Sequence, residues 1–289
     1  MKILVTGANG QLGSELKSIV AQSPEYTFVD VEQMDLSKEE SINAFFYNRE
    51  FQFVIHCAAY TAVDQAENDR DTALCINGDA VKRIATLCKE RNMRMIYIST
   101  DYVFDGNGNE PIRVDAKPNP LSVYGESKLK GEQHVQQLLD NAYIIRTAWV
   151  YSYFGKNFVK TISKLARERD TLGVIYDQVG SPTNARDLAH VILQIIDKIN
   201  SGSVDQPGTY HYTNEGVISW YDLAHFIVDH YGLKCKIKPI TTADYITLAV
   251  RPKYSVLDKS KLKETFGIEI PHWHDSLRSC LNALEETLR

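Results

Sequence analysis

The sequence predicts an α/β fold with a doubly wound parallel sheet, and three observations lead to this prediction. Short β-rich runs alternate with helix-like segments of about ten or more residues, which is typical of β-α-β units. A glycine-rich turn joins the first run to the first helix-like segment. Of the 289 residues, 44% are hydrophobic and 24% are charged, which suits a folded globular protein with its own core.

The first half of the chain shows the alternation most clearly. The β-rich runs cover residues 2–6, 26–31, 53–57, 94–99 and 142–147. The helix-like segments between them cover about residues 11–21, a stretch starting at Ser37, residues 69–92 and a stretch starting at Tyr124. Ser37 and Glu40 have the spacing of a capping box, in which each side chain accepts a hydrogen bond from an amide of the first helical turn.

The second half continues with a less regular alternation. Further strands are expected at residues 172–176, 208–213, 236–240 and 254–257, and helices at residues 184–199, 219–231 and 274–288. Residues 106–120 and 202–207 are turn-rich, and we interpret them as loops rather than interdomain linkers.

Charge and hydropathy exclude several classes of protein. There are 37 acidic residues against 32 Lys and Arg, and no block of like charges, which argues against nucleic acid or an anionic membrane as a main partner. No run approaches the roughly 18 apolar residues of a membrane span, and the apolar run before Gly7 is too short for a signal peptide. The five cysteines include no C-x-x-C pair and predict free thiols. We therefore expect a cytoplasmic protein.

The glycine-rich turn has the pattern G-x-x-G-x-x-G, formed by Gly7, Gly10 and Gly13. Glycines in such a turn let the backbone approach a pyrophosphate and let the following helix pack closely on the strand, and the helix amides carry the phosphate charge. The strand, turn and helix context favours a Rossmann-type dinucleotide-binding fold over a turn without a ligand. We expect residues 1–150 to form this domain, with contributions from about 172–213, and residues 151–289 to form mainly a smaller α/β substrate-binding lobe.

Asp30 ends the second β-rich run, where it should face the adenosine ribose of the cofactor. A carboxylate can accept a hydrogen bond from the 2′-hydroxyl of NADH, whereas the 2′-phosphate of NADPH prefers an Arg, which residues 29–40 lack. The residues therefore favour NADH. Two alternatives stay open: Asp30 only ends the strand, or Asp35 and Leu36 contact the adenine instead.

Tyr124 and Lys128 are four positions apart at the start of a helix, so they lie on one helix face. A cationic amine near a phenol lowers the pKa of the tyrosine toward the range of an acid–base catalyst. Thr100 ends the fourth β-rich run at the same sheet edge, where its hydroxyl could donate to an oxygen that becomes an alkoxide. The alternatives are a chance surface pair and an ordinary strand-ending threonine.

The glycine turn, the hydroxyl residue and the Tyr-x-x-x-Lys pair, in this order, resemble the extended short-chain dehydrogenase/reductase superfamily. Longer strings across most of the chain narrow the resemblance to the dTDP-4-dehydrorhamnose reductase family. These strings lie at residues 58–64, 99–104, 119–120, 123–125, 146–151, 157–158, 177–178, 180–183 and 251–252.

The resemblance implies reduction, by NADPH or NADH, of the C4 ketone of dTDP-4-dehydro-6-deoxy-L-mannose. The product, dTDP-L-rhamnose, is a donor for cell-surface polysaccharide. Tyr124 is implied as the proton donor, Lys128 as the residue that tunes it and binds the ribose, and Thr100 as an assistant at the oxygen. The implied cofactor contacts are Gly10, Gln11, Leu12, Asp35, Leu36, Ala59 and Tyr60. The implied sugar-nucleotide contacts are Thr61, Val63, Asp101 and Trp149.

Several alternatives stay open beside the resemblance. Trp149 could be a core or interface aromatic, and Arg251 could bind a substrate phosphate through a bidentate hydrogen bond or simply belong to a loop. Some members of the family form metal-linked dimers, and Glu15 lies at a position of that kind, but no complete ligand set is present, so we expect no metal. A homodimer stays open. The rival functions are another nucleotide-sugar epimerase or dehydratase, and a non-catalytic regulatory subunit that binds a dinucleotide.

Overall fold

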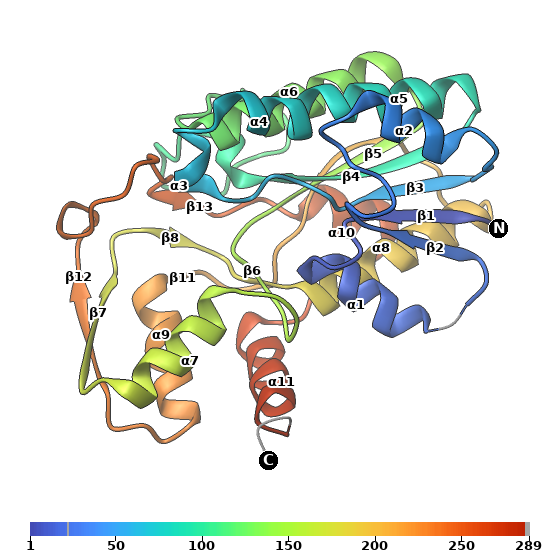
Figure 1. Cartoon of the computed structure of the whole chain (residues 1–289). Coiled ribbons are helices and arrows are strands. Elements are labelled where there is room, and N and C mark those ends of the chain that lie inside the picture. The colour runs from blue at the N-terminus through green and yellow to red at the C-terminus, as the bar shows by residue number, and fades with distance from the viewer. Residues whose placement is uncertain (22, 287–289) are drawn as a thin grey trace.

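The computed structural model describes residues 1–21 and 23–286 and is built around a six-stranded parallel sheet (Figure 1). Its strand order is β10-β5-β4-β3-β1-β2. The strands are β1 (Ile3–Thr6), β2 (Tyr26–Val29), β3 (Phe53–His56), β4 (Arg94–Thr100), β5 (Ala142–Thr147) and β10 (Gly208–His211). Because β1 lies between β2 and β3, the winding direction reverses there, and the predicted doubly wound sheet is confirmed.

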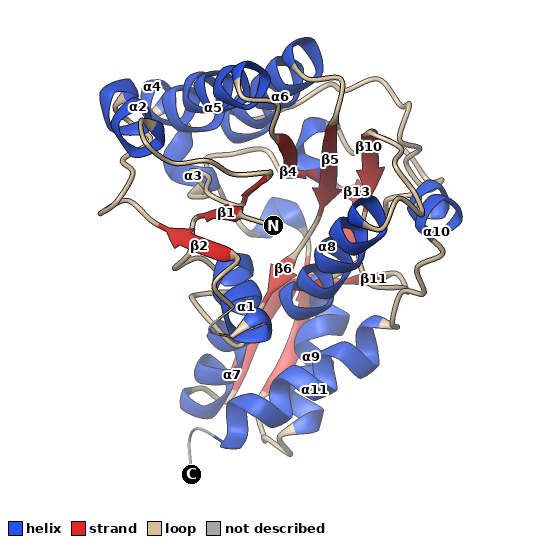
Figure 2. Cartoon of the chain, turned by 90° about the vertical axis from the view of Figure 1, so that its right-hand side faces the viewer, coloured by secondary structure: helices blue, strands red, loops and turns tan. Residues whose placement is uncertain are grey.

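Helices cover both faces of the large sheet (Figures 1 and 2). On one face lie α2 (Glu39–Phe46), α4 (Arg70–Leu74), α5 (Ala80–Glu90) and α6 (Val123–Leu138), and on the other lie α1 (Gln11–Val20) and α8 (Ala185–Asn200). The alternation of side chains along β1 divides the core accordingly: Ile3 and Val5 pack with α1 and α8, while Leu4 packs with α2 and α5. Within the described residues, no helix combines the length and apolar character needed to span a membrane.

A smaller α/β lobe lies beside the large sheet and has its own apolar core. It contains β7 (Thr171–Ile175) paired in parallel with β12 (Lys236–Ile240), and the helices α7 (Phe158–Glu168), α9 (Trp220–His230) and α11 (Trp273–Glu286). The predicted strand at residues 172–176 thus belongs to this small sheet, whereas β10 belongs to the large one.

A short two-stranded sheet and a short three-stranded sheet lie near the smaller lobe. They are β6 (Val150–Tyr151) with β9 (Thr183–Asn184), and β11 (Ile218–Ser219) with β8 (Val179–Gly180) and β13 (Tyr254–Ser255). Their pairing brings together segments between residues 150 and 255, all from the second half of the chain.

Some local predictions were wrong. Ser37 does not cap a helix: its amide and hydroxyl both donate to Asp35 Oδ1, at 2.9 and 2.6 Å, and α2 begins later, at Glu39. The helix expected at residues 69–92 is interrupted by a π-helical turn, η1 (Cys75–Asp79). Three α-helices in the described residues were not predicted, namely α3 (Val63–Ala66), α7 and α10 (Ser260–Phe266). Of the closing helix expected at residues 274–288, residues 287 and 288 lie outside the described residues.

Candidate active site

The glycine turn between β1 and α1 leaves no space for side chains at two of its three glycines. Gly7 has a φ of +68°, and a Cβ there would lie 2.7 Å from the Ala58 amide nitrogen. A Cβ at Gly13 would overlap the carbonyl oxygen of Gly7. Gly10 precedes α1 and supplies no side-chain cap, so the first amides of the helix stay available for an anion. The main chain of this turn therefore fits a pyrophosphate.

A pocket of about 150 Å³ lies beside this turn, where the sheet reverses its winding direction. Among the residues that line it are five of the expected cofactor contacts: Gly7, Asp30, Asp35, Leu36 and Ala59. The pocket lies at the carboxyl ends of β1 and β2, which is where a nucleoside binds in folds of this kind.

The two carboxylates of this pocket have different surroundings. The Asp30 carboxylate accepts hydrogen bonds from the amides of Asn9, at 2.7 Å, and Val31, at 2.8 Å, which joins the end of β2 to the glycine turn. Asp35 accepts from Ser37 and lies 2.9 Å from Lys38, and these contacts lower the pKa of Asp35 to about 2. Lys38 is thus already engaged with a carboxylate.

Two expected pyrophosphate contacts have side chains that point elsewhere. Leu12 is buried in the core between the sheet and α8, so only its main chain is left for a cofactor. The side-chain Nε2 of Gln11 donates to the Val150 carbonyl at 3.4 Å, and its Oε1 accepts from the Asn157 side chain at 2.9 Å. Gln11 therefore joins the start of α1 to the segment around β6 and the start of α7.

Tyr124 and Lys128 lie on the first two turns of α6, at the carboxyl edge of the sheet. The Ser122 hydroxyl caps this helix by accepting from the Gly125 amide at 3.2 Å. Tyr124 is half-buried, with its ring edge-on to Tyr102. Lys128 is buried, and its Nζ donates to the Ile98 carbonyl at 2.7 Å and lies 4.2 Å from the centre of the Tyr97 ring.

Burial shifts the pKa values of both residues in opposite directions. It lowers the pKa of Lys128 to about 7 and raises the pKa of Tyr124 to about 12. The nearby Thr100 hydroxyl lowers the Tyr124 pKa and the charge of Asp101 raises it, but neither reverses the effect of burial. The expected lowering of the Tyr124 pKa by Lys128 is therefore absent from this structure. At neutral pH Tyr124 carries its proton and can donate it.

Thr100 and Asp101 lie at the end of β4, next to Tyr124. The Thr100 hydroxyl donates to Asp101 Oδ1 at 3.0 Å and accepts from the Tyr102 amide at 3.2 Å. Asp101 is buried, which raises the pKa of its carboxyl to about 6 despite its hydrogen bonds with Thr100 and Ser255. The structure thus places Thr100, Asp101 and Tyr124 in one cluster.

Asn77, which the sequence reasoning missed, ties this cluster to Tyr60. Its side-chain oxygen accepts from the Tyr60 amide at 2.9 Å, and its Nδ2 donates both to the Tyr60 carbonyl and to the Ser127 hydroxyl, each at 3.0 Å. Ser127 in turn donates to the Tyr124 carbonyl at 2.8 Å. Asn77 lies in η1, and π-helical turns are frequent at functional sites. The signal that could have found it is the Asn77-Gly78 pair, a turn-type dipeptide inside the helical pattern of residues 69–92.

Among the expected substrate contacts, Trp149 has a φ of +51° and stacks on Trp220, with ring centres 3.7 Å apart. A positive φ in so large a residue is uncommon and points to a constrained position. Two further expected contacts lie at α3. Thr61 is exposed and precedes the helix, and Val63 is half-buried and begins it.

Arg251 is paired with a carboxylate in this structure. Its guanidinium makes a bidentate ion pair with Asp64 of α3, at 3.1 and 2.6 Å, and the Ala249 amide donates to the same carboxylate at 3.1 Å. This contact joins the segment before β13 to the helix that begins at Val63.

Glu15 makes its contacts within the chain. It is buried, accepts from the Ser152 hydroxyl at 2.6 Å and lies 3.5 Å from Arg186. No group of three His, Cys, Asp or Glu side chains in the described part of the chain could hold a metal ion.

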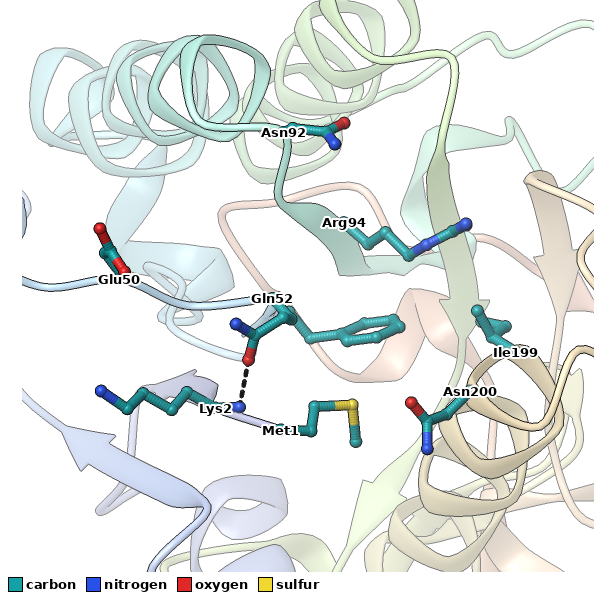
Figure 3. Close-up of a pocket in the computed structure, with 9 residues that line it drawn as sticks. Met1, Lys2, Glu50, Gln52, Asn92, Arg94, Ile199 and Asn200 are labelled. Atoms are coloured by element: carbon teal, nitrogen blue, oxygen red, sulfur yellow. Dashed lines mark hydrogen bonds between the residues drawn. The ribbon is translucent and has the colours of Figure 1, made fainter.

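A separate polar groove of about 770 Å³ lies at the opposite, amino edge of the sheet (Figure 3). It includes Lys2, Gln52 and Arg94, which precede or begin strands β1, β3 and β4. The Lys2 amide donates to Gln52, and Arg94 is held by two hydrogen bonds to Asp205, at 2.7 and 2.6 Å. None of the expected site residues lines this groove.

Comparisons with known proteins find relatives that are similar over nearly the whole chain. The family model described as RmlD substrate binding domain matches residues 1–286. A dTDP-4-dehydrorhamnose reductase from Aggregatibacter actinomycetemcomitans is 37% identical over 286 residues, which cover 96% of this chain and 97% of that protein.

Two solved structures are similar over nearly the whole chain. The crystal structure of a dTDP-4-dehydrorhamnose reductase from Clostridium acetobutylicum has a TM-score of 0.93 and 42% identity, covering 99% of this chain and 100% of that one. That of a dTDP-4-dehydrorhamnose reductase from Bacillus anthracis in complex with NADP has a TM-score of 0.91 and 35% identity, covering 98% and 100%.

Proposed function

The chain belongs to the RmlD substrate binding domain family, and from this premise we propose that it reduces the C4 ketone of dTDP-4-dehydro-6-deoxy-L-mannose to dTDP-L-rhamnose. One observation carries the proposal: Thr100, Tyr124 and Lys128 gather at the carboxyl edge of the sheet, beside a glycine turn that fits a dinucleotide. Relatives named dTDP-4-dehydrorhamnose reductase support the choice of substrate.

The cofactor is NADPH or NADH, which supplies the hydride. The main chain of the glycine turn and the first amides of α1 would hold the pyrophosphate, and the pocket lined by Asp30, Asp35 and Leu36 would hold the adenosine. A structurally similar reductase solved in complex with NADP supports the choice of a nicotinamide dinucleotide as cofactor.

Tyr124 donates the proton that the ketone oxygen needs as negative charge develops on it. The raised pKa of Tyr124 suits this direction of reaction, because the phenol stays protonated at neutral pH. Thr100 lies beside Tyr124 and would hold the same oxygen by a hydrogen bond once its hydrogen is released from Asp101. An ammonium group has three hydrogens, and Lys128 uses one on the Ile98 carbonyl, which leaves it a donor for the nicotinamide ribose.

The test is an assay of NADPH and NADH oxidation at 340 nm with dTDP-4-dehydro-6-deoxy-L-mannose generated in place. We expect stoichiometric oxidation and a product that NMR identifies as dTDP-L-rhamnose. The matched control substrate is dTDP-4-dehydro-6-deoxy-D-glucose, which should react more slowly. Conversion without net oxidation would instead indicate an epimerase, and cofactor binding without turnover would indicate a regulatory subunit.

A further inference from the structure

Glu132 continues the line of ionisable residues that begins with Tyr124 and Lys128. The three residues follow one another at intervals of four along α6, so they share one helix face. Glu132 is 1% exposed, and its two oxygens accept from Arg146 Nε at 2.9 Å and Nη2 at 2.7 Å. Arg146 lies on β5 and is itself 3% exposed. The reduction described above assigns no role to either residue.

Stability alone is a weak reason for such a pair. Removing two charges from water carries a desolvation cost that is comparable to their attraction, so well-packed apolar residues of similar size are often as stabilising. The position of the pair, one helical turn beyond Lys128, suggests that its charge acts on that residue.

Few groups near Lys128 carry a charge at neutral pH. The ionisable groups that act on it are Glu132 on the same helix and Cys57 and His56 at the end of β3, and its Nζ also faces the Tyr97 ring on β4. Burial raises the pKa of Cys57 to about 12 and lowers the pKa of His56 to about 3, so both are neutral at pH 7. Glu132 is therefore the negative charge that opposes the loss of the Lys128 proton.

Arg146 holds the Glu132 carboxylate in place from the sheet. Besides the bidentate contact, its Nη1 donates to the Val114 carbonyl at 3.2 Å, and its guanidinium lies 5.1 Å from the centre of the Phe104 ring. These contacts prevent the carboxylate from turning toward Lys128 and forming a direct ion pair that would occupy the Lys128 hydrogens. Glu132 thus acts on Lys128 through space, and the amine stays available to a ligand.

We propose that Glu132, held by Arg146, is a positioning residue that keeps Lys128 protonated for its contact with the cofactor ribose. The inference rests on the proposed function for the identity of the cofactor, but it does not depend on the sugar substrate. Its test therefore reads cofactor binding rather than turnover.

The experiment measures the NADPH dissociation constant by fluorescence between pH 6 and 9, together with the thermal unfolding midpoint. In the wild-type protein we expect binding to weaken as the pH rises through about 7, where Lys128 loses its proton. In E132Q the weakening should move to lower pH by about one unit, because the negative charge near Lys128 is gone. At pH 7.5 this corresponds to a dissociation constant raised by up to about tenfold.

Two further variants separate this role from a structural one. E132Q leaves the Arg146 charge buried without its partner, which lowers the unfolding midpoint and leaves an unpaired positive charge near Lys128. The double variant E132Q/R146M removes both charges and should recover stability while keeping a smaller shift of the pH profile in the same direction. E126Q is the matched control, since Glu126 lies on the same helix and pairs with Arg70 but is 48% exposed. Solvent screens that charge, so its profile should equal that of the wild type.

The inference would be overturned if the NADPH dissociation constant of the wild type did not change with pH. It would also be overturned if the double variant had the same pH dependence of this constant as the wild type. Failure of the proposed function looks different: NADPH binding would show the expected pH shifts while the ketone of the dTDP-sugar stayed unreduced. Conversely, a protein that reduces the sugar but shows no shift in E132Q/R146M would leave the proposed function intact and make Glu132 purely structural.

Discussion

The Thr100 hydroxyl donates its single hydrogen to the buried carboxylate of Asp101, 3.0 Å away. While this hydrogen bond holds, Thr100 has no hydrogen left for the oxygen of a bound ketone. Burial raises the pKa of Asp101 to about 6, so the carboxyl gains a proton in mildly acidic solution. A protonated Asp101 can donate to Thr100 instead, and this frees the threonine hydrogen for the substrate.

We therefore expect the kcat of ketone reduction at saturating NADPH to fall as the pH rises through about 6. D101N has no proton to lose, so its kcat should be independent of pH in this range. Because folding raises the Asp101 pKa above the usual 3.8, the native-state stability should also fall as the pH rises from about 4 to 6. Steady-state kinetics and thermal unfolding between pH 4 and 8 measure both effects. If kcat of D101N fell with rising pH as in the wild type, Asp101 would not be the group that controls Thr100.

Tyr124→Phe removes the proposed proton donor and keeps the ring that packs against Tyr102. We expect turnover to fall by about 10²–10⁴-fold, the usual contribution of a general acid, while NADPH affinity stays nearly unchanged. The 340 nm assay and fluorescence titration measure the two quantities. Retention of more than about a tenth of the wild-type turnover would refute the role given to Tyr124.

Asp30→Ala tests how the adenosine pocket chooses its cofactor. The wild-type carboxylate should accept a hydrogen bond from the ribose 2′-hydroxyl of NADH and repel the 2′-phosphate of NADPH. In the variant, the ratio of kcat/KM for NADPH to kcat/KM for NADH should therefore rise about tenfold. Asp35→Ala is the matched control, because Asp35 lines the same pocket. A larger shift in D35A would assign the contact to Asp35. If kcat/KM of the wild-type protein were about tenfold or more higher with NADPH than with NADH, the role given to Asp30 would be wrong.

Gly13→Ala should prevent the close packing of α1 on the glycine turn. The added methyl would overlap the Gly7 carbonyl oxygen, so we expect a loss of about 1–3 kcal/mol in the free energy of unfolding and much weaker NADPH binding. Gly10→Ala is the control for stability, since its Cβ would lie 3.2 Å from the same oxygen and its backbone is extended. Equal unfolding midpoints for the two variants would show that the packing at Gly13 is tolerant.

Trp220→Leu removes the ring on which Trp149 stacks. If Trp149 contacts the sugar nucleotide, the loss of this support should raise KM for the substrate about tenfold and change kcat much less. Trp273→Leu removes another half-buried tryptophan of the smaller lobe, one that contacts Phe226 and not Trp149. Steady-state kinetics of the two variants should therefore differ in KM, and a similar KM in both would argue against a substrate role for the Trp149 stack.

The sequence by itself determined the parts of this protein that depend on local patterns. The alternation of β-rich and helical runs predicted the doubly wound sheet, because the period of apolar residues decides which face of each element is buried. The glycine turn and the spacing of Tyr124 and Lys128 were equally local, since each is set by the geometry of one turn or one helix face.

Only the tertiary structure decided the contacts between distant segments. Asn77 and Tyr60, Arg251 and Asp64, and Glu132 and Arg146 meet because helices and strands pack together, and no spacing in the chain marks these pairs. The same holds for the pKa values of Tyr124 and Lys128, whose spacing predicted a lowered tyrosine pKa while burial raised it. Desolvation depends on everything that surrounds a side chain in three dimensions, which a linear pattern does not record.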